Sequence, residues 1–234
     1  MNVPAELAAL EAAITECRRC PRLVAWREQV AGVKRAAFRD QEYWGRPVPG
    51  FGDPAAKVAV VGLAPAAHGG NRTGRMFTGD RSGDWLFRAM HRAGFANQAR
   101  SEHRGDGLVL TGAWITAPVR CAPPANRPTT DERDNCAPWL DAELALLPAV
   151  RTFVCLGRYG YDAVFAHLRR RGVVPAPPRP PFAHGAEVVA GGFTVVASFH
   201  PSQQNTFTGR LTEPMLDAVF ARAATLAGGG PSLG

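Results

Sequence analysis

Four cysteines form two widely separated pairs, and no other feature restricts the fold of this chain as much. Cys17 and Cys20 lie near the N-terminus, whereas Cys121 and Cys136 flank a proline-rich stretch in the middle. Four thiolates suit an iron–sulfur cluster or a structural zinc ion, and the residues alone leave both open. Either metal would tie the N-terminal segment to the middle of the chain.

Size and composition predict one globular domain, because 234 residues can build one core without needing two. We expect it to span residues 1–227, with 1–50 forming an N-terminal helix and a cysteine-bearing segment packed on it, and 228–234 a flexible tail. No apolar run reaches the length of a membrane span, and the first residues lack the basic start of a signal peptide. A cytoplasmic protein is expected, in which paired cysteines bind metal more often than they form disulfides.

The chain carries a net charge of +7, and only Lys34 and Lys57 of its 27 basic residues are lysines. Arginine forks match the geometry of phosphate, so a positive surface of this kind favours a polyanion such as nucleic acid. Arginine in place of lysine can also follow from genomic base composition. The charge is therefore mild support for a DNA partner.

Continuous apolar runs alternate with segments of helical spacing from residue 57 onward. The runs predict buried strands at 57–63, 113–119, 151–157 and 193–199. Helices are predicted at 4–17, 83–94, 131–147, 158–170 and 213–227. This alternation indicates a three-layer α/β/α fold with a mainly parallel, four-stranded central sheet covered on both faces.

Three polar loops begin at the carboxyl ends of predicted strands, where ligands of such sheets bind. We name them the first loop (62–80, GLAPAAHGGNRTGRMFTGD), the second loop (120–129, RCAPPANRPT) and the third loop (200–212, HPSQQNTFTGRLT). The first loop fits neither the GxGxxG nor the P-loop pattern. It offers instead a close backbone approach, His68, a carboxylate in Asp80, and Phe77 as a platform for a flat base. Phe77 could equally seat the loop on the sheet, and His68 could equally pack within it.

The other two loops carry groups suited to a nucleobase and to DNA. The Asn126 amide can read a base edge, although an Asx-type turn is the better reading of this residue alone. His200 could donate a hydrogen bond to a developing anion or be a satisfied rim histidine. Phe207 suits an apolar wedge and Arg210 a phosphate, unless the loop is only a connection with Thr212 as N-cap.

The loops and the four cysteines together resemble the uracil-DNA glycosylase superfamily. The motifs are GLAPAAHGGNRTGRMFTGDRSG, RCAPPAN and HPSQQNTFTGRLT, and the likeness runs from about residue 16 to about residue 226. The chain is most similar to the iron–sulfur family known as type b or family 5. The resemblance implies an α/β/α enzyme that flips a damaged base out of DNA and hydrolyses its N-glycosidic bond, leaving an abasic site.

The resemblance also implies roles for particular residues. Asp80 would lie near the sugar or the attacking water, His200 would contact the pyrimidine O2, and Asn126 would read the base edge; these three are the expected catalytic residues. The residues expected to bind substrate are Gly62, Ala64, Ala66, His68, Phe77, Asn126, Asn205 and Arg210. The residues expected to hold a [4Fe–4S] cluster are Cys17, Cys20, Cys121 and Cys136, and the sequence does not exclude zinc in its place.

Two departures from the family pattern affect the expected base pocket. Superfamily members with a polar activating residue in this motif carry an acid or amide where this chain has Ala64, which shifts the catalytic burden to Asp80. The family pattern resembles GLAPG, whereas here Ala66 follows Pro65. Uracil-strict members carry a tyrosine near this position, so the small Ala66 predicts a roomier pocket that tolerates other deaminated or modified bases.

We therefore expect a monofunctional DNA-repair glycosylase that acts as a monomer on uracil-containing or otherwise damaged DNA, in the cytoplasm at the nucleoid. A non-catalytic protein that binds uracil-DNA or DNA ends through the same pocket is the alternative, because Ala64 removes the usual activating side chain. An iron–sulfur electron carrier fits less well, since its cysteines would form a compact run.

Overall fold

The computed structural model describes residues 3–173 and 180–228 and contains one six-stranded sheet in the order β1-β3-β2-β4-β6-β5. Its four central strands are parallel and buried on both faces, as the continuous apolar runs predicted. They are β3 (Ala113–Thr116), β2 (Val58–Val61), β4 (Thr152–Leu156) and β6 (Phe193–Ser198). The predicted fold class is confirmed.

Two short edge strands enlarge the predicted four-stranded sheet to six strands among the described residues. β1 (Phe51–Gly52) pairs antiparallel with β3, and β5 (Glu187–Ala190) pairs antiparallel with β6. A two-residue strand leaves no periodic signal. β5 alternates exposed and buried residues, with Val189 largely exposed, and its sequence offers only three consecutive apolar residues, 188–190.

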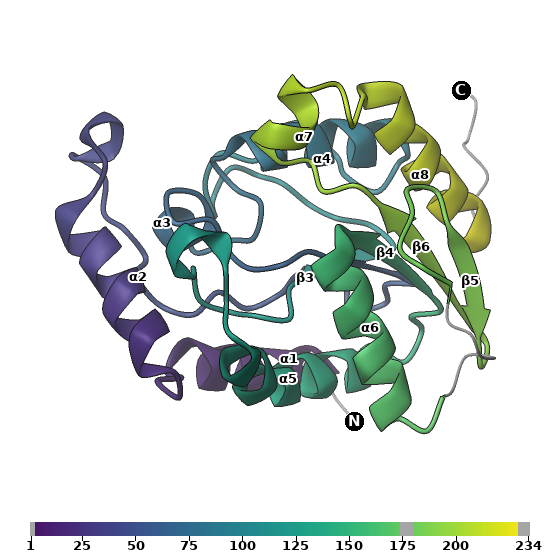
Figure 1. The fold of residues 1–234 in the computed structure, drawn as a ribbon, viewed down its shortest axis with the longest axis horizontal. Helices are drawn as coiled ribbons and strands as arrows, with labels where there is room; N and C mark the ends of the chain where they lie inside the picture. The colour runs from purple at the N-terminus through teal and green to yellow at the C-terminus, as the bar shows by residue number, and fades with distance from the viewer. Residues whose placement is uncertain (1–2, 174–179, 229–234) are drawn as a thin grey trace.

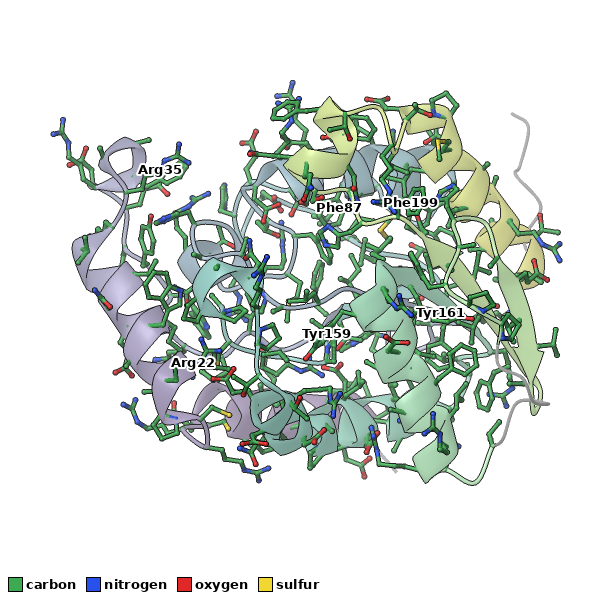
Figure 2. All side chains as sticks on the ribbon, in the orientation of Figure 1. Arg22, Arg35, Phe87, Tyr159, Tyr161 and Phe199 are labelled. Atoms are coloured by element: carbon green, nitrogen blue, oxygen red, sulfur yellow. The ribbon has the colours of Figure 1, made fainter. Side chains whose placement is uncertain are left out.

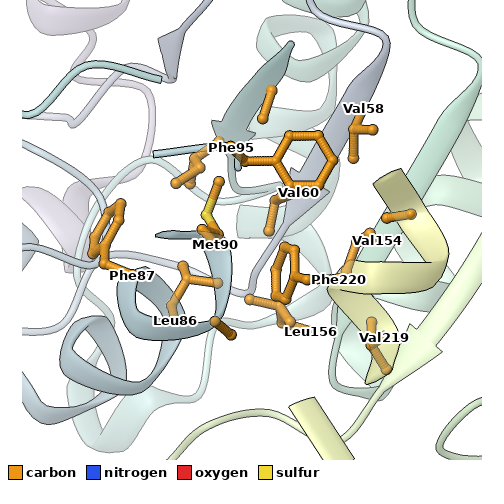
Figure 3. Packing of buried hydrophobic residues seen from close by; sticks show 14 of the residues in the cluster. Val58, Val60, Leu86, Phe87, Met90, Phe95, Val154, Leu156, Val219 and Phe220 are labelled. Atoms are coloured by element: carbon orange, nitrogen blue, oxygen red, sulfur yellow. The ribbon is translucent and has the colours of Figure 1, made fainter. Parts of the chain in front are cut away.

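Helices cover both faces of the sheet (Figure 1). α4 (Arg81–Arg92) and α8 (Glu213–Leu226) pack on one face, where Leu86, Met90 and Phe220 meet the even-numbered valines of β2 and β4 (Figure 3). α1 (Val3–Thr15), α5 (Thr130–Ala145) and α6 (Arg158–Arg170) cover the opposite face. The three layers follow from this two-sided burial of a parallel sheet.

The N-terminal segment contains two long helices rather than the single one predicted. α1 ends at Thr15, and α2 (Pro21–Val33) begins directly after Cys20, with Pro21 in its first position. Pro is favoured there because its missing N–H would be unpaired in any case. α2 lies at the outer edge of the molecule in Figure 1, beyond the three layers.

Four short helical turns lie in the connecting segments of the described chain. They are η1 (Ala36–Phe38), α3 (Gly70–Thr73), η2 (Pro124–Asn126) and α7 (Gln203–Phe207). The last three belong to the first, second and third loops, respectively. No helix among the described residues is long and apolar enough to cross a membrane. Of the predicted tail, residues 229–234 lie outside the described residues.

Candidate active site

The three loops meet at the carboxyl edge of the sheet, as the parallel topology predicts. Backbone hydrogen bonds join their starting points: the Gly62 N–H donates to the Thr116 carbonyl at 3.0 Å, and the Val119 N–H donates to the Leu63 carbonyl at 3.3 Å. The first and second loops therefore leave the sheet together. On the other side, the Gly157 N–H donates to the Ser198 carbonyl at 2.7 Å, beside the start of the third loop.

Asp80 ends the first loop and is also the N-cap of α4. Its Oδ1 accepts a hydrogen bond from the Gly83 N–H at 2.9 Å. The carboxylate lies directly against Gly69, where a Cβ would overlap Oδ2. Burial raises the pKa of Asp80 to about 6, because the backbone hydrogen bonds only partly offset the loss of solvent. Such a carboxyl is tuned close to neutral pH, as a catalytic acid or base requires.

His200 begins the third loop and faces Phe77. The two ring centroids lie 5.9 Å apart at an interplanar angle of 31°, within the range of aromatic contact. Burial lowers the pKa of His200 to about 4, so its imidazole is neutral at pH 7. A neutral imidazole still donates one N–H, and the Asn205 side-chain amide fixes the backbone here by donating to the His200 carbonyl at 2.9 Å.

Phe77 occupies a strained position at the centre of the first loop. Its φ of 52° is rare for a bulky residue, and strain of this kind clusters at functional sites. The half-buried ring lies over Gly62, where a Cβ would stand 2.7 Å from Cζ. Phe77 thus does seat the loop on the sheet, while its stacking on a base stays a prediction.

Asn126 lies exposed in the second loop, and its side chain bonds to no other described residue. Ala125 and Asn126 both have φ in the left-handed region, at 52° and 55°, and asparagine tolerates that conformation better than most residues. Arg22 of α2 lies beside the chain that leads from η2 into α5 (Figure 2), donating to the Arg127 carbonyl at 3.1 Å and to Glu132. The loop is therefore braced by Arg22, while the Asn126 side chain stays exposed.

The remaining residues predicted to bind substrate each contact a neighbouring part of the protein. His68 Nδ1 lies 3.0 Å from the Tyr43 hydroxyl, and burial lowers the pKa of His68. The Ala66 carbonyl accepts hydrogen bonds from Gly69 and Asn71, so it closes a turn. Ala64 packs beside Leu23, Val119 and Cys121, and the Arg210 guanidinium stacks 4.5 Å from the centre of the Phe199 ring.

Two buried arginines that sequence reasoning missed fix the first loop. Arg72 donates to the carbonyls of His68 and Gly79, both at 2.7 Å, and so holds two separate points of the loop together. Arg75 donates to Asp106 at 2.6 Å. Burial alone would raise the pKa of Asp106, but hydrogen bonds from Arg75 and the backbone outweigh it and lower that pKa to about 2. Both arginines lie within the first loop, but the chain is so rich in arginine that the sequence did not distinguish these two from the others.

A buried ion pair holds the start of the second loop. Arg120 donates to both carboxylate oxygens of Glu143 on α5, at 3.1 and 2.8 Å, and both side chains are almost fully buried. Glu143 also accepts from the Gly50 N–H and the Thr116 hydroxyl, so its charge is well satisfied. Arg120 precedes Cys121 directly, and the pair therefore fixes where that cysteine lies.

All four predicted metal-binding cysteines line one small cavity between α2 and α5. Each sulfur lies within hydrogen-bond distance of a different N–H donor. The pairs are Trp139 Nε1 to Cys17 at 3.4 Å, Asn135 Nδ2 to Cys20 at 3.9 Å, Arg27 Nη1 to Cys121 at 2.9 Å and the Arg120 backbone N–H to Cys136 at 3.3 Å. Thiolates, rather than neutral thiols, make full use of such donors, so the donor set suits a thiolate-bound metal group.

Burial raises the pKa of the Cys121 thiol to about 11 and that of Cys136 to about 12. Only a bound cation would keep these sulfurs ionised near neutral pH. As the described chain stands, no three His, Cys, Asp or Glu side chains are arranged to hold a metal ion. The cysteines converge on one cavity, and their metal stays a prediction.

A sequence model described as the Uracil DNA glycosylase superfamily matches residues 49–224. This span contains the whole sheet and all three loops. The chain therefore belongs to the uracil-DNA glycosylase superfamily.

Curated relatives refine this assignment to the type-5 family. The chain is 56% identical over 222 residues to a type-5 uracil-DNA glycosylase of Mycobacterium leprae, covering 94% of this chain and 95% of the relative. It is 53% identical over 216 residues to a type-5 uracil-DNA glycosylase of Thermus thermophilus, covering 92% and 95%. A type-4 uracil-DNA glycosylase of Archaeoglobus fulgidus shares 31% identity over 121 residues, about half of each chain.

Proposed function

We propose that this protein is a monofunctional DNA-repair glycosylase, a hydrolase that removes uracil from DNA and leaves an abasic site. The observation that carries this proposal is the convergence of the three loops at the carboxyl edge of the sheet, where His200 faces Phe77 and the Asp80 carboxylate caps α4. Asp80 has its pKa raised to about 6, and His200 has its pKa lowered to about 4. At pH 7 the site thus presents a carboxylate and an uncharged N–H donor.

Cleavage of the N-glycosidic bond separates charge in a way that suits this pair. The C1′–N bond breaks with its electrons leaving on the base, so the sugar becomes positive and the base negative. Asp80 as a carboxylate stabilises the sugar and orients the water whose oxygen bonds to C1′, accepting its proton. His200 donates its N–H to the anionic base, and a donor aimed at developing charge is worth several kcal/mol, on the order of 3.

The substrate assignments follow from the positions of the loops. Phe77 stacks on the flipped base, and the amide of Asn126, which bonds to no other described residue, reads its edge. Asn205 holds the His200 backbone, while the exposed Arg210 meets a phosphate. The small Ala66 leaves room for other deaminated or modified bases beside uracil. The protein acts as a monomer in the cytoplasm, at the nucleoid.

Cys17, Cys20, Cys121 and Cys136 hold a [4Fe–4S] cluster in this proposal, supported by the shared cavity and by one N–H donor for each sulfur. Hydrolysis is redox-neutral, so the cluster, when bound, serves as a structural anchor. A visible spectrum distinguishes it from zinc: a broad absorbance and a brown colour indicate iron and sulfide, and a colourless metal-loaded protein indicates zinc.

A strand-scission assay tests the enzymatic proposal. The metal-loaded protein is incubated with duplex and single-stranded DNA carrying one uracil, and alkali then cleaves any abasic site. Scission at the uracil position is expected; its absence with folded, loaded protein would overturn the proposal. Parallel substrates with hypoxanthine and etheno-cytosine test the wider base range.

A non-catalytic uracil-DNA binder is the second candidate, and Ala64 favours it because the usual activating side chain is missing. Binding to uracil-DNA without release of free uracil would establish this reading instead.

A further inference from the structure

Arg27 of α2 is a buried cation with no role in the proposed reaction. Only 2% of its surface is exposed. The carboxylate paired with it, Glu28, lies 3.9 Å away, is half exposed, and bonds more closely to Arg18. The Arg27 Nε has no partner among the described residues. A buried guanidinium with such weak compensation is costly unless a negative group lies nearby.

The guanidinium is directed at the four-cysteine site. Its Nη1 donates to Cys121 Sγ at 2.9 Å and lies 3.1 Å from the Cys17 carbonyl, so one nitrogen spans both cysteine pairs. Four thiolates outweigh the positive charge of a zinc ion or of an oxidised [4Fe–4S] core, so the loaded site is net negative. Arg27 is therefore placed to compensate the charge that the site acquires on loading.

The backbone of the same residue reaches the first loop. The Asn71 side-chain amide is fully buried and donates to the Arg27 carbonyl at 3.2 Å. The Asn71 N–H donates in turn to the Ala66 carbonyl at 3.0 Å, inside the motif that leads to Phe77 and Asp80. A continuous line of hydrogen bonds thus runs from Cys121 through Arg27 and Asn71 to the loop of the candidate active site.

We propose that Arg27 is a positioning residue that couples the four-cysteine site to the first loop. Loading of the cysteines fixes the guanidinium, the guanidinium fixes this turn of α2, and the Arg27 carbonyl fixes Asn71. This inference rests on the proposed metal-loaded glycosylase. Groups that orient metal ligands in this way typically change metal affinity or activity by about 10- to 100-fold when removed.

Two variants test the two ends of the line. Arg27→Gln removes the charge next to Cys121, and we expect the midpoint potential of the cluster to become more negative, because the reduced, more negative state loses its compensating cation. Asn71→Leu breaks only the loop end, so we expect an unchanged potential, faster amide exchange over residues 66–74 and about 10-fold slower uracil release. Arg39→Gln is the control: it removes an exposed arginine that, among the described residues, pairs only with the exposed Asp40, and it should change neither readout.

Unchanged potential and unchanged exchange in a loaded Arg27→Gln protein would overturn the proposal. Should that variant fail to fold, Arg27→Lys is measured instead, because lysine keeps the positive charge but lacks the planar guanidinium. For Arg27→Lys we expect a midpoint potential close to that of the wild type and faster amide exchange over residues 66–74. Amide exchange at the wild-type rate would refute the coupling. The wild-type protein is measured first. Absence of a metal or of uracil release there would refute the proposed function, and the exchange measurement would still decide the coupling.

Discussion

The Asp80 carboxylate accepts a hydrogen bond from the Gly83 N–H at 2.9 Å, so the candidate catalytic carboxylate is also the N-cap that starts α4. One side chain thereby links the stability of a helix to the chemistry of the site. Its two roles make different demands, because a cap needs only an oxygen acceptor, whereas catalysis needs a titratable carboxylate.

Substitution of Asp80 by asparagine separates these roles. Asn also caps helices well, so we expect the stability of α4 to change little, while uracil release under single-turnover conditions falls by about 10²- to 10⁴-fold. Thr212→Ala is the control, because Thr212 caps α8 in the same way and its loss should cost about 1 kcal/mol without slowing release. Full activity in Asp80→Asn would remove the carboxylate from the mechanism.

The pH dependence of uracil release follows from the two shifted pKa values. Asp80 must be ionised, so below pH 6 the rate should fall by about tenfold per pH unit, and above pH 6 it should level off. The pKa of His200 is about 4, so its protonation adds a further fall in rate only near the acid end of the range tested. A rate profile between about pH 4.5 and 8.5 checks this; a rate that rises toward low pH would assign Asp80 the role of an acid instead.

Gly62→Ala tests the packing of Phe77. The new Cβ would stand 2.7 Å from Phe77 Cζ, so the ring must move, and we expect release to slow by about 100-fold while the metal is retained. Gly32→Ala is the matched control, because Gly32 lies in α2 with nothing within 4 Å of the added carbon and should gain up to about 1 kcal/mol of stability. Equal activity in both variants would contradict a role for the Phe77 ring position.

Replacement of one of the proposed metal-binding cysteines should act on folding before it acts on catalysis. We expect Cys136→Ala to lose the bound metal and much of its soluble yield, because three ligands remain around a buried cavity. Cys155→Ala is the comparison: this thiol is fully buried in β4, so its loss should cost about 1 kcal/mol through a small cavity and leave the metal content unchanged. Metal analysis and circular dichroism of both variants check this prediction, and a folded Cys136→Ala protein with full metal content would contradict it.

The sequence was most informative where its signal is local. β2 and β3 are short continuous apolar runs, and the polar loops that follow them could be assigned to one edge of a parallel sheet from their order in the chain alone. β5 was missed because it offers only three consecutive apolar residues before two glycines. α2 was missed because a charged residue, Arg27, takes one of its four buried positions and so breaks the apolar spacing.

Side-chain partners far apart in the chain could not be read in the same way. Arg75 finds Asp106, and Arg120 finds Glu143, only once the chain has folded. The double role of Asp80 was also missed, although an aspartate just before a helical segment is a familiar N-cap pattern. The four cysteines could be assigned to one site from the sequence, but the N–H group that donates to each sulfur could not be identified from it.

Cys121 and Cys136 bracket the second loop, and this arrangement would make the repair capacity of the cell depend on its iron supply. If the four cysteines hold the proposed iron–sulfur cluster, a chain synthesised without iron would lose the anchor at both ends of the loop that presents Asn126. Such a chain would be exposed to proteases at the loop. A pulse-chase experiment under iron starvation should therefore show a shorter lifetime of the protein, with its synthesis unchanged.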